Sequence, residues 1–143
     1  MIIIGNDHGA IELKKALIEH LDKEKISYLN LGPDEKTSVD YPDIAKAVAE
    51  KMLEMPEAKG VLLCTTGVGI SITANRYEHM RCALCHNILT AKLSREHNNA
   101  NCIAMGGGMV GNKLGVEMLD AFINTDFSGG ERHIRRIDKM NCK

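Results

Sequence analysis

The chain has 143 residues, of which 44% are apolar and 26% are charged, with three tyrosines, two phenylalanines and no tryptophan. This length suits one domain, whose core has to be built from aliphatic side chains and methionine. A formal net charge of -1 argues against nucleic acid or an anionic membrane as the partner, because binding to either needs a broad positive field.

The N-terminus and the cysteines indicate the compartment. The first residue is followed directly by the apolar run 2–5, without a basic region or a cleavage site, and no apolar stretch approaches the ~18 residues that span a bilayer. The five cysteines are an odd number, which favours free thiols in a reducing compartment over a disulfide framework. We therefore expect a cytoplasmic protein that acts on a small molecule.

Short apolar runs alternate with segments of helical period, a pattern typical of repeated βαβ units and a parallel sheet. Strands are predicted at residues 2–5, 26–31, 61–64, 81–85 and 102–105. Helices are predicted at about 13–21, 44–52, 70–77, 88–96, 113–124 and 131–141. Right-handed crossovers then give one three-layer α/β/α domain over residues 1–143, with a five-stranded parallel sheet and a ligand site at the carboxyl ends of the strands.

In chain order, the first polar cluster is Asp7 with His8, in the turn that leads from the first strand into a helix. A carboxylate and an imidazole at such a turn can serve a ligand site. Asp7 can equally be a helix N-cap, and the residues alone leave both readings open.

The segment after the third strand is the most informative one, because Cys64-Thr-Thr-Gly-Val-Gly69 leads into a helix. Its glycines let backbone amides approach a ligand, and a helix N-terminus offers unpaired N–H groups. The positive end of that helix would favour the Cys64 thiolate, which could then act as a base or nucleophile. The alternative is a buried structural cysteine before an ordinary glycine turn. The spacing matches neither a dinucleotide fingerprint nor a P-loop.

A cysteine pair in the fourth strand region gives a misleading signal. Residues 82–86 read Cys-Ala-Leu-Cys-His, which matches the pattern for c-type haem attachment and half of a zinc site. In a strand, however, residues three apart point to opposite faces, and no second Cys-x-x-Cys exists. We expect Cys82 and Cys85 to be packing residues and expect no metal.

Two further polar clusters lie closer to the C-terminus. Residues 97–101 read His-Asn-Asn-Ala-Asn directly before the fifth strand, where they can bind sugar hydroxyls or form an Asx-rich helix stop. Arg132 and Arg136 are four residues apart on a predicted helix, so two guanidinium groups can grip one phosphate. A solvated basic face is the alternative for this pair.

Five segments taken together resemble the ribose-5-phosphate isomerase B family, which also contains the galactose-6-phosphate and allose-6-phosphate isomerases. They cover nearly the whole chain and are residues 5–9, 40–42, 64–71, 94–98 and 129–136. The resemblance implies a Rossmann-like fold and no metal or organic cofactor. It also implies a homodimer, or a dimer of dimers, with active sites at the subunit interface and a sugar phosphate as the substrate.

The resemblance further implies a role for each matching residue. Cys64 is similar to the base that moves a proton between C2 and C1 through a cis-enediolate, and Thr66 matches the family's loop threonine. His97 resembles the residue that opens the furanose ring, with assistance from Asp7, while backbone amides of residues 65–69 would hold the enediolate oxygens. The implied substrate-binding set is Asp7, His8, Tyr41, Thr65, Thr66, Gly67, Val68, Gly69, Asn98, Arg132 and Arg136.

The implied reaction converts ribose 5-phosphate to ribulose 5-phosphate, with a hexose 6-phosphate or a non-catalytic subunit role as alternatives. The chain departs from the family pattern at two places. Thr65 stands where the family usually has glycine, and residues 106–108 are all glycine where the family commonly has a basic residue. Arg135 or Lys113 can supply the missing cation.

Overall fold

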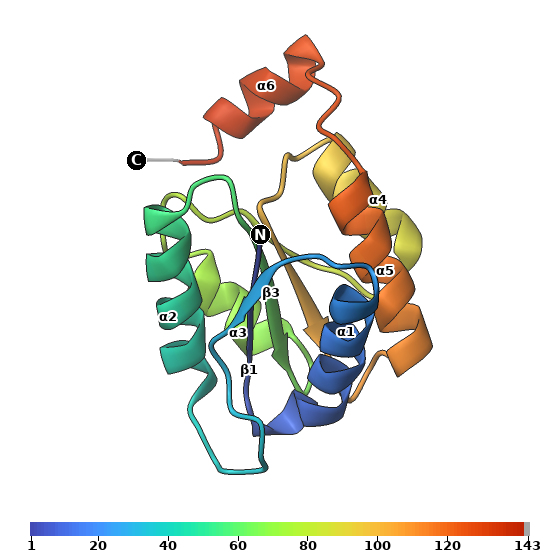
Figure 1. Cartoon of the computed structure of the whole chain (residues 1–143). Helices are drawn as coiled ribbons and strands as arrows, with labels where there is room; N and C mark the ends of the chain where they lie inside the picture. The colour runs from blue at the N-terminus through green and yellow to red at the C-terminus, as the bar shows by residue number, and fades with distance from the viewer. Residues whose placement is uncertain (142–143) are drawn as a thin grey trace.

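The middle layer of the molecule is a parallel sheet (Figure 1). The structure is a computed structural model that describes residues 1–141. Its strands are β1 (Ile2–Asn6), β2 (Tyr28–Asn30), β3 (Lys59–Cys64), β4 (Cys82–Leu84) and β5 (Cys102–Gly106). They lie in the order β2-β1-β3-β5-β4, and all four pairings are parallel. The predicted five-stranded parallel sheet is therefore confirmed.

Helices cover both faces of this sheet. The helices within residues 1–141 are η1 (His8–Ala10, a 3-10 turn), α1 (Ile11–Lys23), α2 (Tyr41–Glu54), α3 (Val68–Ala74), α4 (Ile88–Glu96), α5 (Asn112–Asn124) and α6 (Glu131–Asp138). Buried side chains of α1, α4 and α5 pack on one face of the sheet, and those of α2 and α3 pack on the other. Figure 1 shows these layers on either side of the strands.

Apolar periodicity explains this packing. Leu13, Leu17 and Leu21, spaced four residues apart, form the buried stripe of α1. In β1, Ile2 and Ile4 face one core cluster and Ile3 faces the other, because successive strand residues point to opposite faces. A strand buried on both faces reads as a continuous apolar run, as expected for a parallel sheet.

The cysteines behave as packing residues in the same way. Cys82 belongs to the cluster beneath α2 and α3, and Cys85 belongs to the opposite cluster, so the two thiols do face opposite sides of the sheet. The cysteines within residues 1–141 are all buried free thiols. The fifth cysteine, Cys142, lies outside the described residues.

Several element bounds differ from the predicted ones for local reasons. The edge strands β2 and β4 are shorter than expected, because each pairs with one neighbour over three residues. Helix α2 begins at Tyr41 rather than at residue 44, since Pro42 occupies its first turn, where a missing N–H has no consequence. Helix α3 begins earlier, at Val68, because Gly67 adopts the left-handed conformation directly before it.

Helix α6 stands apart from the three layers. Figure 1 shows it at the end of the sheet opposite to the carboxyl ends of the strands. None of the residues that the structure describes in α6 is buried. Its connection to the body includes the bond from the Ser128 amide to the Glu96 carbonyl, at 3.1 Å.

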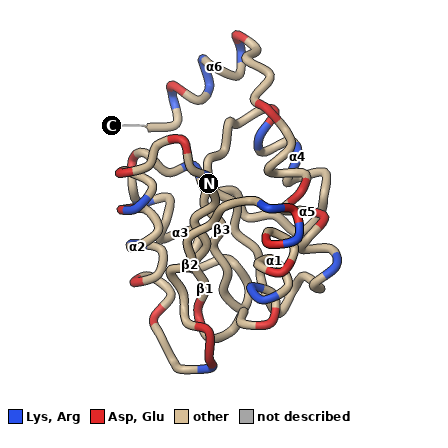
Figure 2. The backbone as a smooth tube through the Cα atoms, viewed as in Figure 1, with Lys and Arg blue, Asp and Glu red and all other residues tan. Residues whose placement is uncertain are grey.

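Charge is distributed without a dominant field. Figure 2 shows Lys and Arg interspersed with Asp and Glu over the outer helices, in keeping with the net charge of -1. Within residues 1–141, no helix is both long and apolar enough to cross a membrane.

Candidate active site

A cavity of about 460 Å³ opens at the carboxyl ends of the strands. It brings together seven of the residues that the sequence analysis singled out, contributed by the ends of β1 and β3, the loop before α3, and the starts of α2 and α3. The lining residues are Asp7, Tyr41, Cys64, Thr65, Thr66, Val68, Gly69 and Ile72. Of these, Ile72 was missed, although its position one turn after Val68 places it on the same helix face.

Cys64 is the last residue of β3 and is 4% exposed. Its sulfur accepts a hydrogen bond from the Gly67 amide at 3.1 Å. Gly67 has a φ of 79°, and an added Cβ would lie 2.7 Å from Leu84 Cδ1, so this turn requires glycine. The turn folds the amide back onto the thiol, which places one N–H donor directly at the sulfur.

The amide cradle predicted over residues 65–69 is only partly open. The Gly67 amide is bound to the Cys64 sulfur, and the Val68 amide donates to Thr66 Oγ1 at 3.2 Å. The amides of Thr65, Thr66 and Gly69 therefore remain the candidates for holding substrate oxygens.

Asp7 combines the two readings that the sequence left open. It is the N-cap of η1, with Oδ1 accepting from the Gly9 amide at 2.8 Å, and it also lines the Cys64 cavity. Its exposed neighbour His8 does not line this cavity, and its Nδ1 accepts from the Val39 amide at 3.3 Å. With Nδ1 engaged as an acceptor, the donor of the neutral His8 ring is Nε2.

Tyr41 lies directly against the first turn of α3. A Cβ added at Gly69 would be 2.5 Å from Tyr41 Cζ, so the ring occupies the space that a side chain at residue 69 would need. Tyr41 is 39% exposed, which leaves part of its ring open to the cavity that it lines.

Thr65 packs between two glycines. A Cβ added at Gly9 would lie 2.0 Å from Thr65 Oγ1, and one at Gly108 would lie 3.1 Å from Thr65 Cγ2. The Gly108 amide also donates to the Thr65 carbonyl at 2.8 Å. The two departures from the family pattern are therefore neighbours. Lys113, one of the two cations considered as a replacement, lines a different cavity beside His20.

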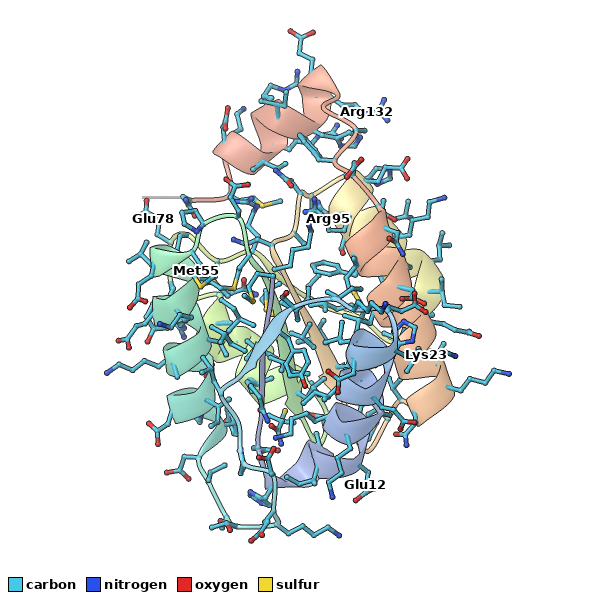
Figure 3. All side chains as sticks on the ribbon, viewed as in Figure 1. Glu12, Lys23, Met55, Glu78, Arg95 and Arg132 are labelled. Atoms are coloured by element: carbon cyan, nitrogen blue, oxygen red, sulfur yellow. The ribbon has the colours of Figure 1, made fainter. Side chains whose placement is uncertain are left out.

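A second group of predicted residues lies at the opposite end of the sheet. His97 and Arg132 line a cavity of about 530 Å³ between the end of α4 and the start of α6. Asn98, the next residue, lines a separate cavity with Arg81 and Cys82. Arg136 lies one turn further along α6. Figure 3 shows Arg132 at the outer end of that helix, far from the carboxyl ends of the strands.

His133 belongs to this second group, and the sequence analysis assigned it no role although it follows Arg132. Its ring stacks on that of His97, with centroids 4.6 Å apart and an interplanar angle of 10°. The pKa of His133 is lowered, first by desolvation and then by the positive charge of His97 and the neighbouring arginines. A neutral His133 ring can stack on His97 without charge repulsion.

The fold keeps the two groups apart within one chain. In the β3–β5 register, Gly60 lies opposite Cys102 and Cys64 lies opposite Gly106. Four residue steps of strand, about 13 Å, therefore separate the level of Cys64 from the start of β5. His97 precedes that start, so a single chain does not bring Cys64 and His97 together.

The described residues show no metal centre. Among residues 1–141, no three His, Cys, Asp or Glu side chains come together in a way that could hold a metal ion. The side chains that line the two cavities carry a thiol, imidazoles, carboxylates, hydroxyl groups and the guanidinium group of Arg132.

Comparisons with known proteins identify the family. The model of the Ribose/Galactose Isomerase family matches residues 2–140. Ribose-5-P isomerase B of Listeria innocua is 37% identical over 139 residues, which cover 97% of this chain and 93% of the relative.

Solved structures agree with this match. The crystal structure of a ribose 5-phosphate isomerase from Thermotoga maritima has a TM-score of 0.93 at 44% identity, covering 96% of this chain and 94% of that one. Ribose-5-phosphate isomerase B of Mycoplasma genitalium, with bound ribulose-5-phosphate, has a TM-score of 0.91 at 38% identity, covering 96% and 91%. The chain therefore belongs to the ribose/galactose isomerase family of aldose–ketose isomerases.

Proposed function

We propose that this protein interconverts ribose 5-phosphate and ribulose 5-phosphate through a cis-enediolate, with Cys64 as the base. The relatives described above are named for this pentose phosphate, and one of them holds ribulose 5-phosphate. The side chain of Thr65 takes up space at the Cys64 cavity, which favours a five-carbon over a six-carbon sugar.

The proposed chemistry uses the first cavity for proton transfer. The Cys64 thiolate removes the C2 proton of the open-chain aldose, and negative charge develops on O1. The proton then returns to C1, and the hydroxyl proton on O2 passes to O1, which leaves the carbonyl at C2. Amides of Thr65, Thr66 and Gly69 stabilise the oxygens, and in other enzymes one such donor is worth about 10² to 10³ in rate.

Ring opening and phosphate binding use the second group of residues together with Asp7, His8 and Tyr41 from the Cys64 end of the sheet. In this proposal His97 moves the proton that opens the furanose ring, and Asp7 assists at the sugar hydroxyls. Arg132, Arg136 and His8 hold the phosphate, because guanidinium and imidazole N–H groups form charge-assisted hydrogen bonds with its oxygens. Tyr41 and Asn98 line the sugar.

These roles require a homodimer in which His97 of one subunit completes the Cys64 cavity of the other. The separation of the two groups within one chain supports this arrangement. So do the exposed apolar side chains beside each group: Val68 and Ile72 are 45% and 55% exposed at the Cys64 cavity, and Ile134 is 45% exposed on α6. A symmetric interface would cover both sets.

The observation that carries the proposal is the Cys64 thiol at the wall of a cavity, with an amide donor 3.1 Å from its sulfur. The test compares Cys64→Ala with Cys85→Ala, a matched control that removes another buried cysteine, one that directly follows the edge strand β4. We expect Cys64→Ala to abolish isomerisation of ribose 5-phosphate and Cys85→Ala to retain it, with both variants folded by circular dichroism.

The substrate is tested with the same purified protein. Turnover of ribose 5-phosphate, allose 6-phosphate and galactose 6-phosphate is measured side by side, and we expect the highest kcat/KM for the pentose phosphate. Higher efficiency on a hexose phosphate would replace the pentose assignment. Unchanged turnover by Cys64→Ala would remove this residue from the mechanism.

A further inference from the structure

The turn that carries His97 and Asn98 is held in an unusual way. After α4, the amides of Asn98 and Ala100 both reach the Ser94 carbonyl, at 3.2 and 2.9 Å. Between them, Asn99 has a φ of 45°. This left-handed backbone conformation has an energetic cost for residues other than glycine, and the cost is smallest for asparagine and aspartate. The left-handed conformation of Asn99, directly after the proposed site residues His97 and Asn98, therefore has to be stabilised by its surroundings.

Two arginines bind Asn99 from different elements. The Nε and Nη2 atoms of Arg81 donate to the Asn99 carbonyl at 3.1 and 2.9 Å. Arg95 donates from Nη1 to Asn99 Oδ1 at 2.9 Å and to the Ala100 carbonyl at 2.6 Å. Arg95 is only 8% exposed, and its bonds are charge-assisted and shielded from solvent, which makes them strong.

Arg95 also reaches the segment that leads to α6. Its Nε donates to the Thr125 carbonyl at 3.2 Å, and its guanidinium lies 5.7 Å from the centroid of the Phe122 ring on α5. Figure 3 shows Arg95 on the inner side of the molecule, below α6. One buried cation therefore connects the turn after His97 with the start of the linker that leads to α6, the helix that carries His133.

We infer that Arg95, together with Arg81 and Asn99, is a positioning unit that orients His97 and its stacked partner His133. The inference rests on the proposed function, because it takes His97 as the group that opens the sugar ring. Arg95 itself touches no reacting atom. It fixes the backbone at Ala100, three residues after His97, and at Thr125, eight residues before His133, so that the His97 ring is already oriented when substrate arrives.

This role differs from plain stabilisation of the fold in a way that Asn99 variants can separate. Asn99→Gly removes the Oδ1 acceptor of Arg95 but suits the left-handed backbone better than asparagine does. Asn99→Asp retains an oxygen acceptor for Arg95 and also tolerates that backbone. A structural role predicts that Asn99→Gly lowers stability and slows net conversion and C1 exchange equally, whereas a positioning role predicts that it slows the ring step alone.

Two assays distinguish the ring step from proton transfer. Net conversion of ribose 5-phosphate requires ring opening. Exchange of the C1 hydrogen of ribulose 5-phosphate with deuterium from D₂O requires the enediolate step alone, since this ketose carries its phosphate on O5 and forms no furanose. The variants are Asn99→Gly, Asn99→Asp and Arg95→Met, with Lys92→Met as the control on the exposed side of α4.

We expect Arg95→Met and Asn99→Gly to slow net conversion by up to about 100-fold, the loss that a misplacement of roughly 1 Å can produce, while C1 exchange stays within about threefold of wild type. Asn99→Asp and Lys92→Met should match wild type in both assays. If Arg95→Met does not fold, the Asn99 pair alone decides, because neither of these changes strains the turn.

The inference is overturned if Asn99→Gly converts ribose 5-phosphate at the wild-type rate, or if it loses conversion and exchange equally. The variant His97→Ala, measured in the same two assays, distinguishes a failure of the positioning inference from a failure of the proposed function. A His97→Ala variant that loses conversion beside an unaffected Asn99→Gly overturns the positioning role alone, whereas an unaffected His97→Ala overturns the ring-opening role itself.

Discussion

Mixing two inactive variants is expected to restore activity, because the proposed site is shared between subunits. In a dimer of one Cys64→Ala chain and one His97→Ala chain, one site combines both substitutions and the other combines an intact Cys64 with an intact His97. Each mixed dimer therefore has half of the wild-type sites. Random pairing of equal amounts makes half of the dimers mixed, which gives about 25% of wild-type activity for a symmetric two-site dimer.

The assay isolates the mixed dimer directly. Co-expression with two different affinity tags and two successive purifications yields the mixed species, for which we expect about half of the wild-type specific activity on ribose 5-phosphate, one intact site of two. The matched control pairs a wild-type chain with a chain that carries both substitutions. That dimer has the same composition but no intact site, and should be inactive.

The opposite pattern would refute the reasoning. If both residues acted from one chain, the dimer of single variants would be inactive and the control would have half of the wild-type activity. Such a result would require Cys64 and His97 to approach each other across about 13 Å of parallel strand, against the register of β3 and β5.

Three stability predictions follow from single side chains, each measured by urea or thermal unfolding. Gly67→Ala should lower the free energy of unfolding by at least about 1–2 kcal/mol, the cost of a left-handed alanine, because its Cβ also meets Leu84; equal stability would contradict the strain argument. Lys14→Met should lower the free energy of unfolding by about 1–3 kcal/mol, since the buried ammonium binds Asn30 Oδ1 at 3.2 Å and the Pro33 carbonyl. A variant as stable as wild type would show that the loop after β2 needs no cation. The Lys14 ammonium, 2.7 Å away, lowers the pKa of Asp34, so this carboxylate adds stability above its ordinary pKa of about 3.9 and loses that contribution as pH falls through the lowered value. Asp34→Asn should therefore be less stable than wild type at pH 7 and equal to it in strong acid, and a deficit that persists in acid would assign the effect to packing.

Much of the fold could be predicted because its signals are local. The central strands β1 and β3 are buried on both faces, so they appear as uninterrupted apolar runs. The stripe of leucines on α1 appears at helical spacing. The predicted bounds of β2 and β4 were too wide, because an edge strand ends where its one neighbour stops pairing, and that neighbour is distant in sequence.

Most of the residues that line the first cavity could also be predicted from sequence. Asp7 and Cys64 each follow a strand, and parallel strands deliver the residues that follow them to the same edge of the sheet. The partners of individual amides could not be predicted. Whether the Gly67 N–H meets a ligand or the Cys64 sulfur depends on a backbone turn of a few ångströms.

The amino-acid sequence alone establishes which residue types are available and that a parallel sheet gathers the residues that follow β1 and β3. His97 precedes β5, so the length of that strand separates it from the level of Cys64. The position of α6 at the same end of the molecule as His97 is a result of three-dimensional packing. The direction of α6 depends on contacts such as the His97–His133 stack and the Arg95–Thr125 bond. These contacts join residues that are far apart in the chain, so no hydrophobic periodicity in the sequence indicates them.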